Sequence, residues 1–163
     1  MKPYDIIAQG FGIIGLVLIV YSFQCRKNKS FFIFQGLGGL FFSVNFFMLG
    51  AYAGALFNLI GLVRALIFAG KKPKLYLLIF INSLFLGAFI FSLTLIWGNL
   101  LQIVLSSLTF ASIFTMSIFM YLGNGKHIRY FQFAVVSPSW LVYNIFNFSN
   151  QIIDFFIRNN FIF

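Results

Sequence analysis

Long apolar stretches alternate with short polar connections along almost the whole chain. The first stretch runs from about Tyr4 to Gln24 and is interrupted only by Asp5 and Gln9 near its start. The next three stretches cover 31–49, 52–70 and 75–93; the fifth ends near residue 121, and the sixth covers 130–148. A bilayer core about 30 Å thick takes ~20 residues of helix, so each stretch predicts a membrane-spanning helix. Residues 150–163 form a shorter apolar segment, ~21 Å long as a helix.

Glycines, prolines and flanking charges refine this pattern. Arg26 directly follows the first stretch, so we expect a retained span and not a cleaved signal peptide. Pro73 marks a helix boundary, and 123–129 has strong turn chemistry. Pro138 lies inside the sixth stretch, where it should kink the helix or loosen its backbone hydrogen bonds. Small residues predict close helix packing in the second and third stretches at Gly36, Gly38, Gly39, Gly50, Gly54 and Gly61.

The composition excludes a soluble globular domain. Of the 163 residues, 61% are hydrophobic and only 8% are charged, and the mean hydropathy is +1.00. Soluble domains carry roughly 25% charged residues because their surface faces water. The sequence therefore predicts an all-α polytopic membrane protein whose main partner is the lipid bilayer. The net charge of +9 does not indicate nucleic-acid binding, because the basic residues are dispersed among the connections.

The basic residues predict an orientation. Every odd-numbered connection contains lysine or arginine, whereas the even-numbered connections, near Gly50, Trp97 and Ser149, contain none. The positive-inside rule makes the basic side cytoplasmic, so the N-terminus is expected outside. If the short last segment also crosses, seven helices result and the C-terminus lies inside. The basic connections hold Arg26, Lys27 and Lys29, then Lys71, Lys72 and Lys74, and finally Lys126 and Arg129.

An internal repeat predicts how the helices are grouped. The fourth span, 75–94, separates blocks 4–70 and 97–163, which have the same polarity. We therefore expect a single transmembrane domain with a 3+1+3 layout: two triple-helix bundles and a linker helix. Individual matches are faint, and the helix count carries more weight than they do. They pair Gln35 with Gln132 at equal distances from Lys29 and Lys126, Asn45 with Asn144, and Arg64 with Arg158.

Three segments resemble a known family. The stretches SFQCRKNKSFFIFQ, NFFMLGAYAGALFNLIGLVRALIF and PSWLVYN are similar to the YgjV family of bacterial inner-membrane proteins. That family is distantly similar to the SWEET and PQ-loop sugar transporters. The resemblance implies a multi-pass protein of the inner (plasma) membrane, with two triple-helix bundles and a central pocket for a small, sugar-like solute.

The sequence offers little for enzyme chemistry. Cys25 is the only cysteine, His127 the only histidine, and Asp5 and Asp154 the only acids. These residues do not make a metal-ligand cluster or a nucleophile with its base and orienting group. We therefore expect neither an enzyme nor a cofactor or metal. The absence of a nucleotide-binding motif predicts that any transport is facilitative or ion-coupled.

Arg64 is the most informative candidate site residue. An arginine at helix centre costs ~2.5 to 3.5 kcal/mol on insertion scales, so its side chain must either snorkel to the interface or face a polar interior. Asp154 lies within the short last segment and is the candidate partner for an ion pair with Arg64.

Four other residues are candidates for lining a pocket. Asn45, Asn58 and Asn144 can bind a hydroxylated or amide-bearing solute, or join helices together. Trp140 can stack on a sugar ring or fill the core. The favoured hypothesis is passage of a small polar solute between the bundles. The alternative is a non-transporting structural or partner-binding membrane protein, and the small-residue seams also suit a homodimer.

Overall fold

The regular structure of the described residues is helical. The computed structural model describes residues 3–70, 73–95, 98 and 100–146. The helix that begins with α6 passes through a π-helical segment, η1, and continues over 137–146. The elements are α1 (Pro3–Gln24), α2 (Asn28–Met48), α3 (Tyr52–Ala69), α4 (Leu75–Leu95), α5 (Leu100–Leu122), α6 (Gly125–Phe131) and η1 (Gln132–Val136).

The helices confirm a polytopic membrane architecture. Five of them, α1 to α5, are long and apolar enough to cross a bilayer. Large apolar side chains point outward along their length; Ile13 is 63% exposed and Val104 is 55% exposed. Burial of such side chains against lipid replaces the burial against a core that a soluble protein would need.

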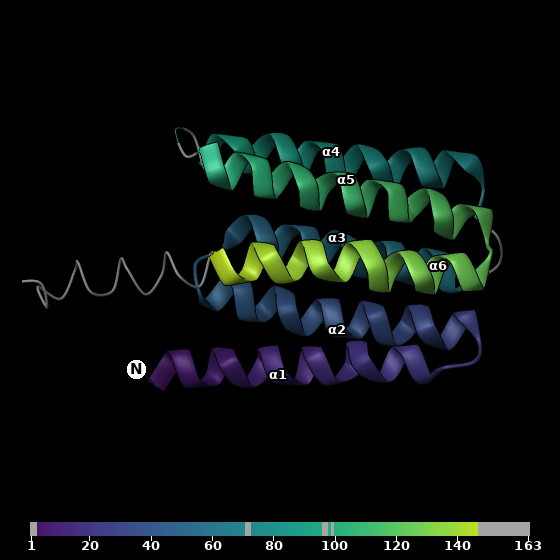
Figure 1. The fold of residues 1–163 in the computed structure, drawn as a ribbon, viewed down its shortest axis with the longest axis horizontal. Coiled ribbons are helices and arrows are strands. Elements are labelled where there is room, and N and C mark those ends of the chain that lie inside the picture. Colours follow the sequence, from purple (N-terminus) through teal and green to yellow (C-terminus); the bar gives the residue numbers. More distant parts are fainter. Residues whose placement is uncertain (1–2, 71–72, 96–97, 99, 147–163) are drawn as a thin grey trace, which may run out of the picture.

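The helices run antiparallel, and their basic connectors gather at one end of the bundle. The connections from α1 to α2 and from α5 to α6 lie at this end, where α3 also finishes and α4 begins (Figure 1). The start of α1 and the connection from α2 to α3 lie at the opposite end. We call the first end the basic end. Its described lysines and arginines are Arg26, Lys27, Lys29, Lys74, Lys126 and Arg129.

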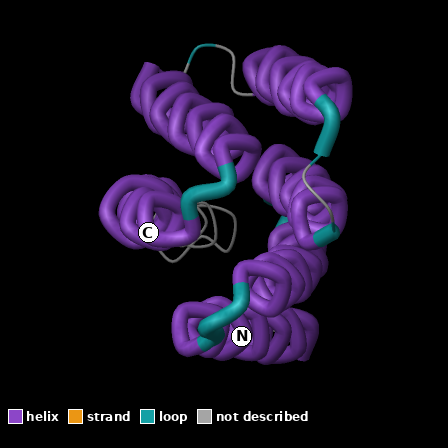
Figure 2. Tube along the Cα trace, turned by 90° about the vertical axis from the view of Figure 1, so that its right-hand side faces the viewer, coloured by secondary structure: helices purple, strands orange, loops and turns teal. Residues whose placement is uncertain are grey.

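The first three helices form a row and not a triangular bundle. α2 packs against both α1 and α3, α4 packs against α3 and α5, and α5 packs against α6. Seen along the helices, α6 lies beside the row, across from α2 and α3 (Figure 2). The seven-helix 3+1+3 layout stays a prediction, because residues 147–163 lie outside the described part of the chain.

Glycines allow the close packing within the row. A Cβ atom at Gly38 would lie 2.6 Å from Ile19 Cγ1 of α1, and one at Gly36 would lie 3.0 Å from Ala65 Cβ of α3. α2 therefore turns glycines toward both neighbours. Gly61, in contrast, has open space around its Cα.

The start of α6 differs from the sequence prediction, and a glycine accounts for the end of α2. The sixth helix begins at Gly125 and not at residue 130, because the Asn124 side chain accepts hydrogen bonds from the backbone N–H groups of Lys126 and His127. α2 ends at Met48, and two residues later Gly50 has a φ of +75°. There the N–H of Ala51 donates to the Phe46 carbonyl at 2.8 Å, as in a Schellman motif.

Candidate functional site

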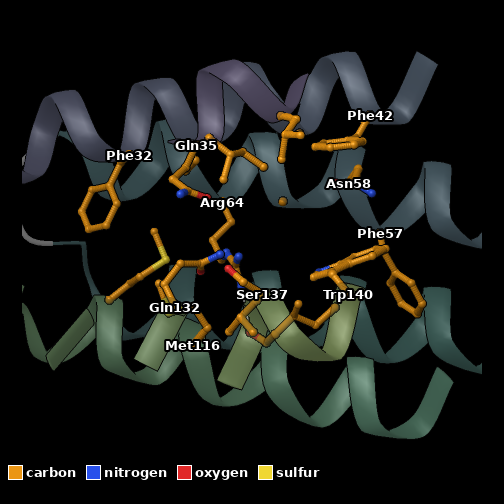
Figure 3. A pocket seen from close by; sticks show the side chains of 18 of the residues that line it. Phe32, Gln35, Phe42, Phe57, Asn58, Arg64, Met116, Gln132, Ser137 and Trp140 are labelled. Carbon is orange, nitrogen blue, oxygen red and sulfur yellow. Dashed lines mark hydrogen bonds between the residues drawn. The ribbon is translucent and has the colours of Figure 1, made fainter. Parts of the chain in front are cut away.

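A cavity of about 220 Å³ lies in the middle of the bundle, and all six α-helices or their continuations contribute to its walls. Aromatic and aliphatic side chains form most of its surface, including Phe57 and Phe85. Figure 3 shows how polar side chains from both walls approach its centre. The polar lining residues are Gln35, Asn58, Arg64, Gln132, Ser137 and Asn144.

Arg64 is held inside the bundle by α5. Its Nη1 donates to the Ile113 carbonyl at 2.7 Å and to Ser117 Oγ at 3.2 Å. The guanidinium carbon also lies 5.2 Å from the centre of the Phe85 ring, within the range of a cation–π contact. Nε is buried and has no hydrogen-bond partner among the residues that the structure describes. The side chain therefore faces a neighbouring helix and the cavity, and does not extend along α3 to the basic end.

The predicted partner of Arg64 lies outside the described residues. Asp154 belongs to the segment 147–163, so the Arg64–Asp154 ion pair stays a prediction. Within the described part of the chain, the hydrogen bonds of Arg64 go to a carbonyl and a hydroxyl.

Asn58, Trp140 and Asn144 line the same cavity as Arg64. Asn58 Nδ2 donates to the Gly54 carbonyl of its own helix at 2.9 Å. Trp140 stacks on Phe46 of α2, with ring centres 6.0 Å apart and planes at 21°. The Oδ1 atom of Asn144 is buried and has no hydrogen-bond partner within the described ranges of the chain.

Asn45 is separate from this group. Its Nδ2 donates to the Ala8 carbonyl of α1 at 2.7 Å, and the amide is buried. Asn45 borders a second cavity of about 420 Å³ between α1, α2 and the helix 137–146, where Asn144 also lies. The structure therefore brings four of the five candidate lining residues together and gives Asn45 a contact between helices.

Two glutamines of the cavity were not among the sequence candidates. Gln35 Nε2 donates to Ser22 Oγ at 2.7 Å, and Gln132 is buried at the start of η1. The internal repeat was the signal that could have found them, because each follows a lysine, Lys29 or Lys126, at the same spacing. Equivalent positions in the two blocks face one cavity.

The π-helical segment places part of this lining. The N–H of Ser137 donates to the Gln132 carbonyl five residues earlier, immediately before Pro138. Ser139 Oγ donates to the Val135 carbonyl at 2.8 Å. The predicted loosening of the backbone hydrogen bonds near Pro138 is thus confirmed, and it turns Gln132, Val136 and Ser137 toward the cavity.

Contacts between helices lie on both sides of the cavity along the bundle. At the basic end, Arg129 Nη2 donates to the carbonyls of Cys25 at 2.9 Å and Arg26 at 3.0 Å. Toward the other end, Phe46 and Trp140 stack on each other, and Phe46 borders both the central and the second cavity. The two cavities share lining residues there: Leu16, Phe42, Phe46, Leu141 and Asn144.

The described residues contain no group of three or more His, Cys, Asp or Glu side chains that could hold a metal ion. The expectations of no cofactor, no metal and no enzyme activity stay predictions.

Comparison with known protein families gives one match. A family model described as Imp-YgjV, bacterial inner membrane protein, matches residues 6–152. Neither the curated proteins nor the solved structures contain a match.

Proposed function

Because the chain belongs to the Imp-YgjV family of bacterial inner membrane proteins, we propose that it carries a small polar solute across that membrane through its central cavity. The protein is multi-pass, with several helices that can span the bilayer. Transport is facilitative or ion-coupled, and the solute is small because a cavity of about 220 Å³ lies below the ~300–1,000 Å³ of common ligand pockets.

The polar lining of the cavity carries this proposal. Polar groups inside a membrane protein are costly unless they are paired or functional. In a solid interior, the amides would satisfy one another across the helices. Here Arg64 Nε and Asn144 Oδ1 are buried without hydrogen-bond partners in the described part of the chain, although both residues line the cavity. A solute with its own donors and acceptors would satisfy them.

The contacts on either side of the cavity suggest a route. A solute entering through the second cavity reaches the centre when the Phe46–Trp140 stack opens, and it leaves when the contacts of Arg129 at the basic end break. The η1 segment and Pro138 lie between these two places, where the altered backbone hydrogen bonding makes bending less costly than in a regular helix. Alternation between the two closures is our proposed transport cycle.

We also propose the orientation and the remaining helix. The basic end faces the cytoplasm under the positive-inside rule, and residues 150–163 add a seventh span to give the 3+1+3 layout. A relation to SWEET and PQ-loop transporters is part of this proposal.

Flux into vesicles containing the purified protein tests the proposal. The panel should include monosaccharides, polyols, amino acids and small carboxylic acids. Asn144→Leu is expected to abolish flux with little change in melting temperature, because Asn144 lines the cavity and its Oδ1 has no hydrogen-bond partner among the described residues. Asn45→Leu is the comparison variant: it removes the bond to the Ala8 carbonyl and should lower stability by about 1 kcal/mol. Flux through the folded protein should fall less than in Asn144→Leu, because Asn45 borders the second cavity and not the central one.

The alternative makes a different prediction for the same variants. In a non-transporting structural or partner-binding protein, no solute of the panel moves above the rate of empty vesicles. Both asparagine variants then lower stability alone, and our proposal is wrong.

A further inference from the structure

We propose that the solute of the central cavity carries an oxyanion, a carboxylate or phosphate group, and that Arg64 binds it. This inference rests on the proposed function and adds the chemical class of the solute. It follows from the charge, the hydrogen-bonding edge and the surroundings of the Arg64 guanidinium.

The charge of Arg64 has no opposite charge among its described contacts. Its partners are the Ile113 carbonyl, the Ser117 hydroxyl and the face of the Phe85 ring, all of which are neutral. The other described lysines and arginines lie at the basic end, in or beside the connectors. Arg64 therefore gives the cavity a positive charge at a depth where water and salt screen it weakly, and a bound anion would neutralise it.

One edge of the guanidinium has no hydrogen-bond partner among the described residues. Nη1 is used by α5, whereas the structure records no hydrogen bond from Nε or Nη2 to the residues it describes. These two nitrogens present parallel N–H donors on one edge of the planar group. Carboxylates and phosphates accept such a pair in a bidentate fashion, which a neutral hydroxyl cannot do. The fixed Nη1 orients this edge before the solute arrives.

The surrounding side chains can complete an oxyanion site. Gln35 lies on one wall of the cavity, and Gln132 and Ser137 lie on the opposite wall (Figure 3). Their amide and hydroxyl groups can donate hydrogen bonds to oxygen atoms that Arg64 does not reach. The apolar remainder of the lining suits a short carbon chain. The site therefore fits a small organic acid or a phosphate group.

Two other sources of negative charge must be separated from a soluble acid. Asp154, the predicted ion-pair partner, lies outside the described residues. A phospholipid headgroup offers the same oxyanion chemistry from the membrane side. The experiment therefore includes Asp154→Asn and a measurement of bound lipid.

The test is thermal unfolding of the full-length protein in detergent, at constant chloride. Lactate, acetate, succinate and inorganic phosphate are titrated beside the uncharged lactamide, acetamide and succinamide. Arg64→Gln and the charge-conserving Arg64→Lys are compared with Lys74→Gln, which removes one positive charge from an exposed position at the basic end. Circular dichroism verifies that each variant is folded, and mass spectrometry counts the anionic phospholipids that copurify.

We expect at least one acid, and none of the amides, to raise the melting temperature in a saturable manner. Arg64→Gln should raise the half-saturating concentration at least about tenfold, because the lost hydrogen bonds are charge-assisted. Arg64→Lys should lie between Arg64→Gln and the wild type, while Lys74→Gln and Asp154→Asn leave the value unchanged. Loss of one copurified phospholipid in Arg64→Gln, without any effect of the soluble acids, also supports the oxyanion site and identifies a headgroup as its occupant.

Three results would overturn the inference. The first is an equal effect of acids and amides on the melting temperature, without a phospholipid whose copurification depends on Arg64. The second is an effect of the acids on the melting temperature that persists in Arg64→Gln. The third is acid binding that appears only in Asp154→Asn. Flux measurements show whether only the oxyanion inference fails or the proposed transport function fails as well. Neutral solutes that still cross through Arg64→Gln would leave transport standing, whereas acids that bind at Arg64 without any solute crossing would leave only the binding site.

Discussion

Gly38 of α2 lies against α1 with no room for a side chain, so a single methyl group tests the packing of the row. A Cβ atom there would lie 2.6 Å from Ile19 Cγ1 and 3.0 Å from the Gly15 carbonyl oxygen. One is an inner atom of a branched side chain and the other belongs to the backbone, so neither can rotate away. Gly38→Ala must therefore push α1 and α2 apart.

The expected loss of stability combines two opposing terms. Alanine in place of glycine in a helix interior is favourable by ~0.8–1.0 kcal/mol. Ordinary carbon contacts lie at ~3.5–4.0 Å, so Ile19 must retreat by about 1 Å, and overpacking of this kind costs ~1–3 kcal/mol. Because two nearly immovable atoms are involved, we expect the upper part of that range and a net loss of ~1–2 kcal/mol.

Gly87→Ala in α4 is the matched control. Nothing lies within 4 Å of a Cβ atom at Gly87, so only the gain in helix propensity remains, ~0.5–1 kcal/mol. Thermal unfolding in detergent, followed by circular dichroism, should show a lower melting temperature for Gly38→Ala and a higher one for Gly87→Ala. Shifts of the same sign and size in both variants would refute the close approach of α1 and α2.

Three further predictions concern the ends of the helices. Cys25 is half-buried in the connector between α1 and α2 at the basic end, so a membrane-impermeant thiol reagent should not label it in cells whose outer membrane is permeabilised. The same reagent should label Tyr52→Cys in a Cys25→Ser background, because Tyr52 lies at the opposite end. Labelling of Cys25 itself would contradict the proposed orientation. Arg129→Gln removes the hydrogen bonds to the Cys25 and Arg26 carbonyls and should lower the free energy of unfolding by about 1.5 kcal/mol; an unchanged melting temperature would mean that these bonds contribute nothing. Asn124→Ala removes the cap of α6 and should cost ~1 kcal/mol, whereas Asn124→Ser keeps it, so equal melting temperatures for the two variants would contradict the capping role.

The helices were more predictable than the contacts between them. The third apolar stretch predicts a helix over 52–70, and α3 covers Tyr52–Ala69. The sixth helix starts earlier than predicted because Asn124 provides a local cap, which outweighs the turn tendency of the residues after it. Its altered hydrogen bonding followed from Pro138, since proline lacks the N–H that a regular helix needs.

The candidate site was predictable only in part. Composition and spacing indicated Asn58, Arg64 and Asn144, which line one cavity. The same reasoning could not separate Asn144 from Asn45, because a buried amide suits a pocket and a contact between helices equally well. The separation became visible only in the bond from Asn45 to the Ala8 carbonyl.

The sequence by itself determined that this chain is a membrane protein, where its first five spans lie to within a few residues, and which connectors share a side, because hydropathy and the alternation of basic connectors are local properties along the chain. The tertiary structure alone decided which face of each helix turns inward. A membrane helix is apolar on its lipid side as well as its core side, so its hydrophobic pattern does not reveal the inward face. That choice depends on where a glycine lets a neighbour approach and on which polar groups meet, as Arg64 of α3 meets Ile113 and Ser117 of α5.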